Sequence, residues 1–208
     1  MEYRYLLIVR FILVNVISAS LLFVAYLQGW MDGMFVENTR EFIILITVVF
    51  IYGFIICAAK VWRTCRELDE VKSGSLSPAS RAAKYLATIY NNDRESRSIG
   101  ASVLRAKLTN RITIVRHIAN ALVLLGLIGT VVGFIIALSS VDASASADSE
   151  TIAPVIARLI NGMSVALYTT LVGSVLHIWL IINHRILTTG TVNLYSAIIE
   201  MGEVRGRA

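Results

Sequence analysis

Four long apolar segments alternate with polar ones along the chain, at residues 5–27, 42–60, 117–139 and 159–183. An apolar run of about 20 residues spans the hydrocarbon layer of a membrane as an α-helix. A transmembrane β-strand would instead alternate apolar and polar residues over about ten positions. The pattern therefore predicts an all-α membrane protein with four transmembrane helices.

Apolar residues also recur at helical spacing in the stretch before the third segment and in the stretch after the fourth. No proline interrupts residues 96–139. We therefore expect one helix of more than about 40 residues there, roughly 60 Å long at 1.5 Å per residue. We expect the fourth helix to continue to Ile199, with a break at Gly190, and a shorter amphipathic helix to begin at Ser77–Pro78 and end at 91–93. The third and fourth helices would then extend into the cytoplasm.

The chain divides, in order, into four predicted parts. Residues 1–60 form a first transmembrane hairpin, and residues 61–115 a cytoplasmic helical segment. Residues 116–186 form a second transmembrane hairpin, and residues 187–208 a cytoplasmic tail.

The charge distribution predicts the orientation of these helices. The net charge is +5, from 19 basic and 14 acidic residues, and many of the basic residues lie between the second and third segments. The loop from Ser139 to Pro154 has no basic residue but contains Asp142, Asp148 and Glu150. Because cytoplasmic loops are enriched in Lys and Arg, both termini are predicted to be cytoplasmic. The same distribution explains the positive charge without a nucleic-acid partner.

Composition excludes further classes of protein. The chain is 56% hydrophobic, which is too apolar for a soluble domain of 208 residues. Cys57 and Cys65 lie at the cytoplasmic end of the second segment, where a reducing compartment disfavours a disulfide. No spacing of His, Cys, Asp or Glu predicts a metal site, and no nucleophile–base pair predicts an enzyme.

The apolar segments carry almost no charge. None contains Asp, Glu, Lys or Arg in its middle, and only Arg10 lies near the start of the first. A protein that moves an ion by itself usually needs an ionisable group inside the bilayer. We therefore expect a partner to supply that charge.

Small residues crowd the last two segments, which suits close helix–helix packing. The predicted packing positions are Gly126, Gly129, Gly133, Gly162, Ala166 and Gly173. Thr130 either bonds back to its own helix or faces a polar path.

A second pattern runs along the fourth segment. Met163, Ala166, Thr170, Ser174 and His177 share one helix face, which suggests a surface that faces water or protein. His177 is a candidate proton relay, with a packing role across helices as the alternative.

The runs LGLIGTVVG at 125–133 and ALYTTLVG at 166–173 resemble the MotA/TolQ/ExbB proton-channel family. The resemblance covers roughly the C-terminal half of the chain. It implies a homo-pentamer in the bacterial inner membrane around two copies of a single-span partner like ExbD, TolR or MotB, whose Asp carries the ion. It also implies pore-facing hydroxyls at Thr130 and Thr170, to which Thr169 and Ser174 add neighbouring candidates.

This resemblance predicts a motor subunit that converts proton flow into rotation or force, with sodium as the alternative ion and no bound cofactor. Four segments resemble flagellar MotA, whereas Thr130 is the choice of TolQ and ExbB. The last span also lacks the proline that flagellar stators carry there. The driven process therefore stays open between outer-membrane transport, envelope maintenance and two kinds of motility.

Two other classes compete with the channel. A membrane scaffold without ion flux would need the glycine packing but not the hydroxyls. A secondary transporter would need broken helices and a charged site at the bilayer midplane; the sequence has neither.

Overall fold

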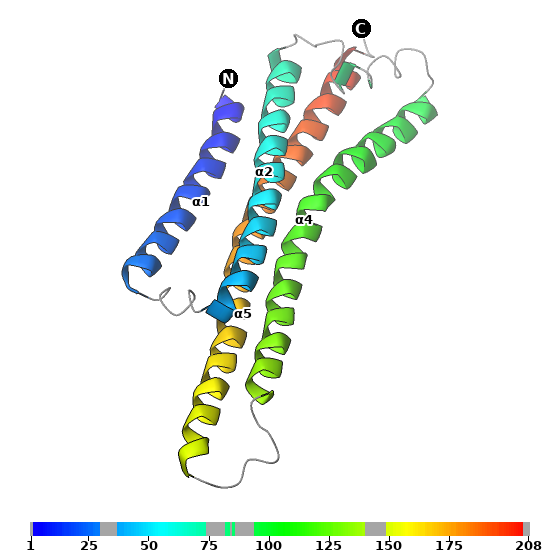
Figure 1. Cartoon of the computed structure of the whole chain (residues 1–208). Coiled ribbons are helices and arrows are strands. Elements are labelled where there is room, and N and C mark those ends of the chain that lie inside the picture. The colour runs from blue at the N-terminus through cyan, green and yellow to red at the C-terminus, as the bar shows by residue number, and fades with distance from the viewer. Residues whose placement is uncertain are drawn as a thin grey trace. The chain divides into compact units, whose positions relative to one another are not determined.

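The computed structural model describes residues 2–29, 37–73, 82–83, 85, 94–139 and 149–205. Its long elements are four α-helices, and no strand occurs among these residues (Figure 1). They are α1 (Glu2–Leu27), α2 (Glu37–Ser73), α4 (Arg94–Leu138) and α5 (Ser149–Arg205). Each contains a stretch long and apolar enough to cross a membrane, so the predicted all-α class with four such helices is confirmed.

The observed lengths of α4 and α5 can be compared with the lengths that the sequence predicted. α4 is a single helix of 45 residues, as its uninterrupted apolar spacing predicted. The predicted break at Gly190 is wrong, because α5 continues through it to Arg205. A side-chain carbon at Gly190 would lie 2.7 Å from the Leu7 side chain of α1. Gly190 therefore makes room for a neighbouring helix instead of ending its own.

The acidic loop is shorter than the sequence predicted. α5 begins at Ser149, so Pro154 lies inside the helix and not at the end of the loop. Proline removes one backbone hydrogen bond, which a long helix tolerates near its beginning. Asp142, Asp148 and the predicted helix start at Ser77–Pro78 lie outside the described residues.

The described helices divide into two compact units, each built from segments of all four. The first contains residues 1–16, 54–116 and 181–208, and the second contains residues 17–53 and 117–180. The sequential division into 1–60, 61–115, 116–186 and 187–208 stays a prediction.

The first unit has an apolar core where α2, α4 and α5 meet. Its buried members are Leu68, Val71, Ala82, Tyr85, Leu104, Leu108, Leu194 and Ile198. The spacing of the α4 and α5 members, at steps of four, is that of one helix face. This core explains why both helices stay regular beyond their apolar segments.

A polar contact joins α1 to α5 in the same unit. Asn15 Nδ2 donates a hydrogen bond to Asn183 Oδ1 at 2.9 Å, and Asn183 Nδ2 donates to Asn15 Oδ1 at 3.2 Å. Asn183 is fully buried. Side-chain amides commonly bond across helices inside membranes, where lipid offers no alternative partner.

In the second unit, α2 packs against both α4 and α5. A side-chain carbon at Gly53 would come 2.7 Å from Ile118 Cγ2 and 2.9 Å from Leu180 Cδ2. One turn earlier, the rings of Phe50 and Trp179 lie 5.1 Å apart. Gly53 thus allows three helices to meet at one level.

Large apolar side chains cover the surface of α1. Only 6% of its most apolar stretch is buried. Val16, Leu21, Phe23 and Leu27 are all more than half exposed. An apolar surface of this extent suits contact with lipid or with another protein.

We predict that Asn15→Leu destabilises the fold because it removes both hydrogen bonds between Asn15 and the buried amide of Asn183. In membrane proteins such bonds contribute about 0.6 kcal/mol on average and up to about 1.7 kcal/mol. The free energies of unfolding of Asn15→Leu, Asn183→Leu and the double variant Asn15→Leu/Asn183→Leu, measured in detergent, give the coupling energy between the two residues. If the double variant loses as much stability as the two single variants together, the coupling is absent and the prediction is wrong.

Candidate functional site

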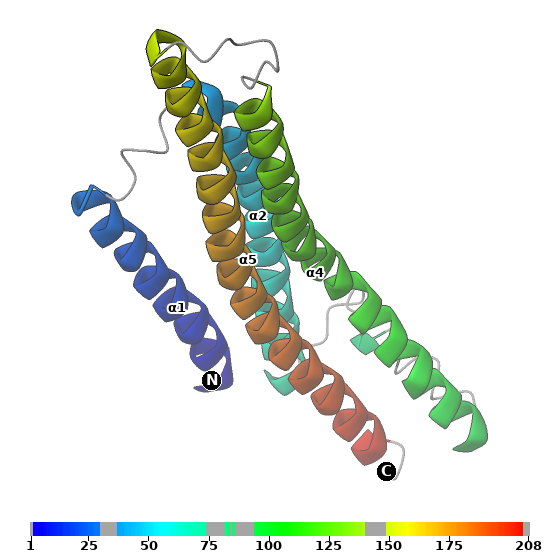
Figure 2. The same ribbon diagram turned by 90° about the horizontal axis from the view of Figure 1, so that it is seen from below.

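The backbones of α4 and α5 approach each other closely in the second unit (Figure 2). A side-chain carbon at Gly133 would lie 2.6 Å from the Ala166 nitrogen and 2.7 Å from the Gly162 oxygen. One at Gly173 would lie 2.7 Å from the Leu122 oxygen. Since these neighbours are backbone atoms that cannot turn away, only glycine fits this approach.

The remaining small residues predicted from the sequence lie in the same contact. Gly126 faces Thr169, Thr170 and Gly173, and Gly162 faces Gly133 and Ala137. Ala166 is buried beside Gly133. The structure therefore brings all six predicted packing residues to one antiparallel helix contact.

Thr169 lies inside this contact. It is fully buried, and a side-chain carbon at Gly129 would lie 2.5 Å from its Cβ. Its hydroxyl lies 2.9 Å from the Val165 oxygen and 3.1 Å from the Ala166 oxygen, both on its own helix. The structure thus gives Thr169 a packing position, and its place on an ion pathway stays a prediction.

Thr170 and Thr130 lie at the edge of the same contact. Thr170 is exposed, and its hydroxyl donates to the Gly126 oxygen of α4 at 3.3 Å. Thr130 is partly exposed and donates to the Leu127 oxygen at 2.6 Å. Gly126 and Thr130 are one turn apart on one face of α4. The two hydroxyls therefore bond to the oxygens of consecutive α4 residues, Gly126 and Leu127.

Two further predicted residues lie on α5 beyond Thr170. Ser174 is partly buried. His177 is also partly buried, and its Nδ1 lies 2.8 Å from the Ala119 oxygen of α4. Because a carbonyl oxygen only accepts, this bond requires the ring hydrogen on Nδ1. His177 bonds across helices, as the packing alternative describes, and a relay role stays a prediction.

Charged residues are absent from the spanning parts of this hairpin. Residues 118–138 and 159–183 contain no Asp, Glu, Lys or Arg. Within the described ranges, no group of three or more His, Cys, Asp or Glu residues could hold a metal ion. The hairpin offers hydroxyl and backbone oxygens, which can coordinate a cation or accept a hydrogen bond from a protonated group. These oxygens remain uncharged.

A sequence model of the MotA/TolQ/ExbB proton channel family matches residues 82–200, which is more than half of the chain. The chain belongs to this family. The match covers all of α4 and most of α5, and with them every predicted site residue. Searches of curated proteins and of solved structures each returned no match.

The family and the four apolar helices together make the chain a multi-pass membrane protein of a proton-channel family. The resemblance seen in the two sequence runs is confirmed. The first hairpin, α1 and α2, lies outside the matched residues.

Two contacts were not expected from the sequence. One is the Asn15–Asn183 pair, and the other is a bond from Lys60 Nζ to the Arg111 oxygen. Asn15 is the one amide side chain in the first apolar segment, which was an available signal. No sequence signal identified its partner, because the two residues are 168 positions apart.

We predict that Gly133→Ala destabilises the hairpin, because the added carbon meets the backbone of α5. Overpacking of this kind typically costs about 1–3 kcal/mol. Gly100→Ala is the matched control on α4, since its added carbon would lie 3.6 Å from the Tyr85 ring, an ordinary contact. In detergent, the midpoint of thermal unfolding should fall for Gly133→Ala and stay unchanged for Gly100→Ala. Equal midpoints for the two variants would contradict the close approach of the helix backbones.

Proposed function

We propose that this chain is the channel-forming subunit of a motor complex in the bacterial inner membrane. In this proposal five copies surround two copies of a single-span partner of the ExbD, TolR or MotB kind, whose membrane Asp carries the ion. The observation that carries the proposal is a proton-channel hairpin with accessible hydroxyls at Thr130 and Thr170 but no carboxylate of its own.

The physics of a membrane carboxylate supports this division of labour. An ionised Asp at the bilayer centre costs at least about 2.5–3.5 kcal/mol, and protonation removes most of that cost. The partner's Asp would take up a proton outside, cross in neutral form and release it near the hydroxyls of Thr130 and Thr170. Each proton that crosses yields about 2.3 kcal/mol per 100 mV.

The number of subunits would turn this proton flow into motion. Five identical subunits cannot present matching surfaces to two partner helices at once. Release of one proton would therefore favour a step that brings the other Asp into position. Repeated steps would give rotation or force, and the driven process stays open among transport, envelope maintenance and motility.

The proposed topology places both termini and the inner ends of α4 and α5 in the cytoplasm. Its support is the concentration of basic residues between the second and third apolar segments. The buried core around Leu108 and Leu194 would then lie beyond the bilayer, as a cytoplasmic extension of each subunit.

The transported ion in this proposal is the proton, with sodium as the alternative. Hydroxyl oxygens are hard ligands that also suit sodium, and Thr130, Thr170 and Ser174 supply three. We assign the chain no catalytic activity and no bound cofactor.

We predict that Thr170→Val and Thr130→Val each reduce ion-driven output without loss of the oligomer. Valine keeps the shape and removes a hydrogen-bonding group worth about 1 kcal/mol, so a reduction of roughly fivefold to tenfold is expected. Proton flux into vesicles that hold the complex measures the output.

Thr189→Val is the matched control, because its hydroxyl is exposed and, among the described residues, bonds only to the Arg185 oxygen of its own helix. Normal flux in both Thr130 and Thr170 variants would remove these residues from the ion pathway.

A non-conducting membrane scaffold is the second candidate. The observation that favours it is that both hydroxyls already bond to backbone oxygens within the hairpin, Thr130 to Leu127 and Thr170 to Gly126. In that case Gly129→Leu would destroy assembly, whereas both valine variants would keep full function.

Native mass spectrometry of the chain, alone and with a co-expressed Asp-bearing single-span protein encoded beside it, tests the assembly. We expect a pentamer that captures two partner copies. A monomer or dimer that ignores that protein would overturn the motor assignment and favour the scaffold.

A further inference from the structure

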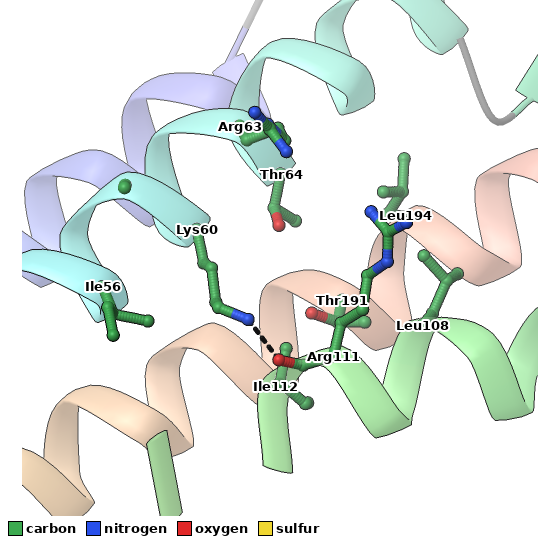
Figure 3. Close-up of a pocket in the computed structure, with 10 residues that line it drawn as sticks. Ile56, Lys60, Arg63, Thr64, Leu108, Arg111, Ile112, Thr191 and Leu194 are labelled. Carbon is green, nitrogen blue, oxygen red and sulfur yellow. Dashed lines mark hydrogen bonds between the residues drawn. The ribbon is translucent and has the colours of Figure 1, made fainter. Parts of the chain in front are cut away.

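A basic pocket lies between α2, α4 and α5 in the first unit (Figure 3). Its volume is about 270 Å³. The lining residues are Ile56, Ala59, Lys60, Arg63, Thr64, Leu108, Arg111, Ile112, Thr191 and Leu194. Three of them are cationic and none is acidic, so the pocket has a strongly positive character.

Two of these cations have no carboxylate partner among the described residues. Neither the Arg63 nor the Arg111 side chain forms an ion pair with any residue that the structure describes. By contrast Arg66, one turn away on α2, pairs with Glu70 at 3.3 Å. Guanidinium groups bind phosphate and carboxylate through paired N–H donors. The pocket therefore concentrates donors for an oxyanion that no described residue provides.

Lys60 connects α2 to α4 at one side of the pocket. Its Nζ donates to the Arg111 backbone oxygen, which fixes a third positive charge at the pocket (Figure 3). Arg111 thus contributes its carbonyl to the wall and its guanidinium to the cavity.

A buried hydroxyl adds a polar group to the same space. Thr64 is 7% exposed, and its hydroxyl has no hydrogen bond to any described residue. In Figure 3 this hydroxyl points toward the space that Lys60 and Arg111 border. A buried hydroxyl without a partner is costly, so a ligand that bonds to it gains free energy. Thr191, in contrast, bonds to the Leu187 oxygen of its own helix at 2.8 Å.

With the apolar segments placed in the bilayer, the pocket begins in the headgroup layer and extends a few Å beyond it. Lys60 ends the second apolar segment, Arg111 precedes the third by six residues, and Thr191 follows the fourth by eight. At 1.5 Å per residue these offsets are about 0–12 Å beyond the hydrocarbon. The polar headgroup region adds about 5–8 Å on each side of the core. Apolar Ile56 and Ile112 line the pocket beside the charged groups.

We propose that this pocket binds the phosphate headgroup of an anionic phospholipid from the surrounding membrane, with Arg63 and Arg111 as its principal ligands. Basic pockets between transmembrane helices on the cytoplasmic side recognise such headgroups. The volume lies just below the range of about 300–1,000 Å³ for pockets that enclose a whole small ligand. It fits a headgroup whose acyl chains lie outside, along the apolar surface.

Native mass spectrometry of the purified full-length chain, titrated with cardiolipin or with phosphatidylethanolamine, tests this site. We expect preferential binding of cardiolipin. The variant Arg63→Gln/Arg111→Gln should bind it about 25-fold more weakly, since each cation near a membrane surface corresponds to about fivefold in affinity. Arg66→Gln/Arg105→Gln is the matched control. It removes two exposed charges from the same helices, outside the pocket, and should keep cardiolipin affinity.

Three results would overturn the proposal. Equal cardiolipin affinity in both double variants would show only general attraction to a basic surface. Inorganic phosphate that competes with cardiolipin at comparable concentration would assign the pocket to a soluble phosphate. If Arg63→Gln/Arg111→Gln no longer binds an acidic partner protein but binds cardiolipin as before, the pocket would be assigned to that protein. Unchanged unfolding midpoints in both variants verify that each is folded.

Discussion

The contact between the backbones of α4 and α5 is the constraint on which the candidate pathway depends. At Gly133, Gly162 and Gly173 the facing helix lies where a side chain would begin. Lipid provides no hydrophobic force between helices, so the fold relies on close van der Waals contact and on bonds such as that from Thr170 to the Gly126 oxygen. This contact buries Thr169 and leaves the next residue, Thr170, at the surface.

The first unit is held together differently. Its core joins Leu108 of α4 to Leu194 and Ile198 of α5, in a region with many basic residues. Two polar contacts join further helices to this core. The Asn15–Asn183 pair connects α1 to α5, and the Lys60 amine connects α2 to α4. Regular apolar spacing outside the apolar segments, together with these bonds, keeps both long helices continuous beyond those segments.

The absence of charge from the hairpin and its concentration in the basic pocket have related consequences. A hairpin without a carboxylate is suited to a partner that brings one, because two buried charges of like sign would repel each other. Arg63 and Arg111, which form no ion pair with a described residue, are proposed instead to bind the headgroups of anionic lipids. In both proposals, a molecule outside the chain neutralises the charge.

The sequence by itself determined the helical class, the four apolar segments, the length of α4 and the family, because all of these are local or periodic properties. It also identified the glycines of the α4–α5 contact, since small residues at helical spacing have few other uses. Only the tertiary structure separated Thr169 from Thr170, because adjacent residues on a helix point about 100° apart and the partner helix decides which is covered. Likewise the packing of Leu7 against Gly190 and the basic pocket between three helices both join residues that are distant in sequence. Such contacts depend on pairing across the fold, which a single sequence does not record.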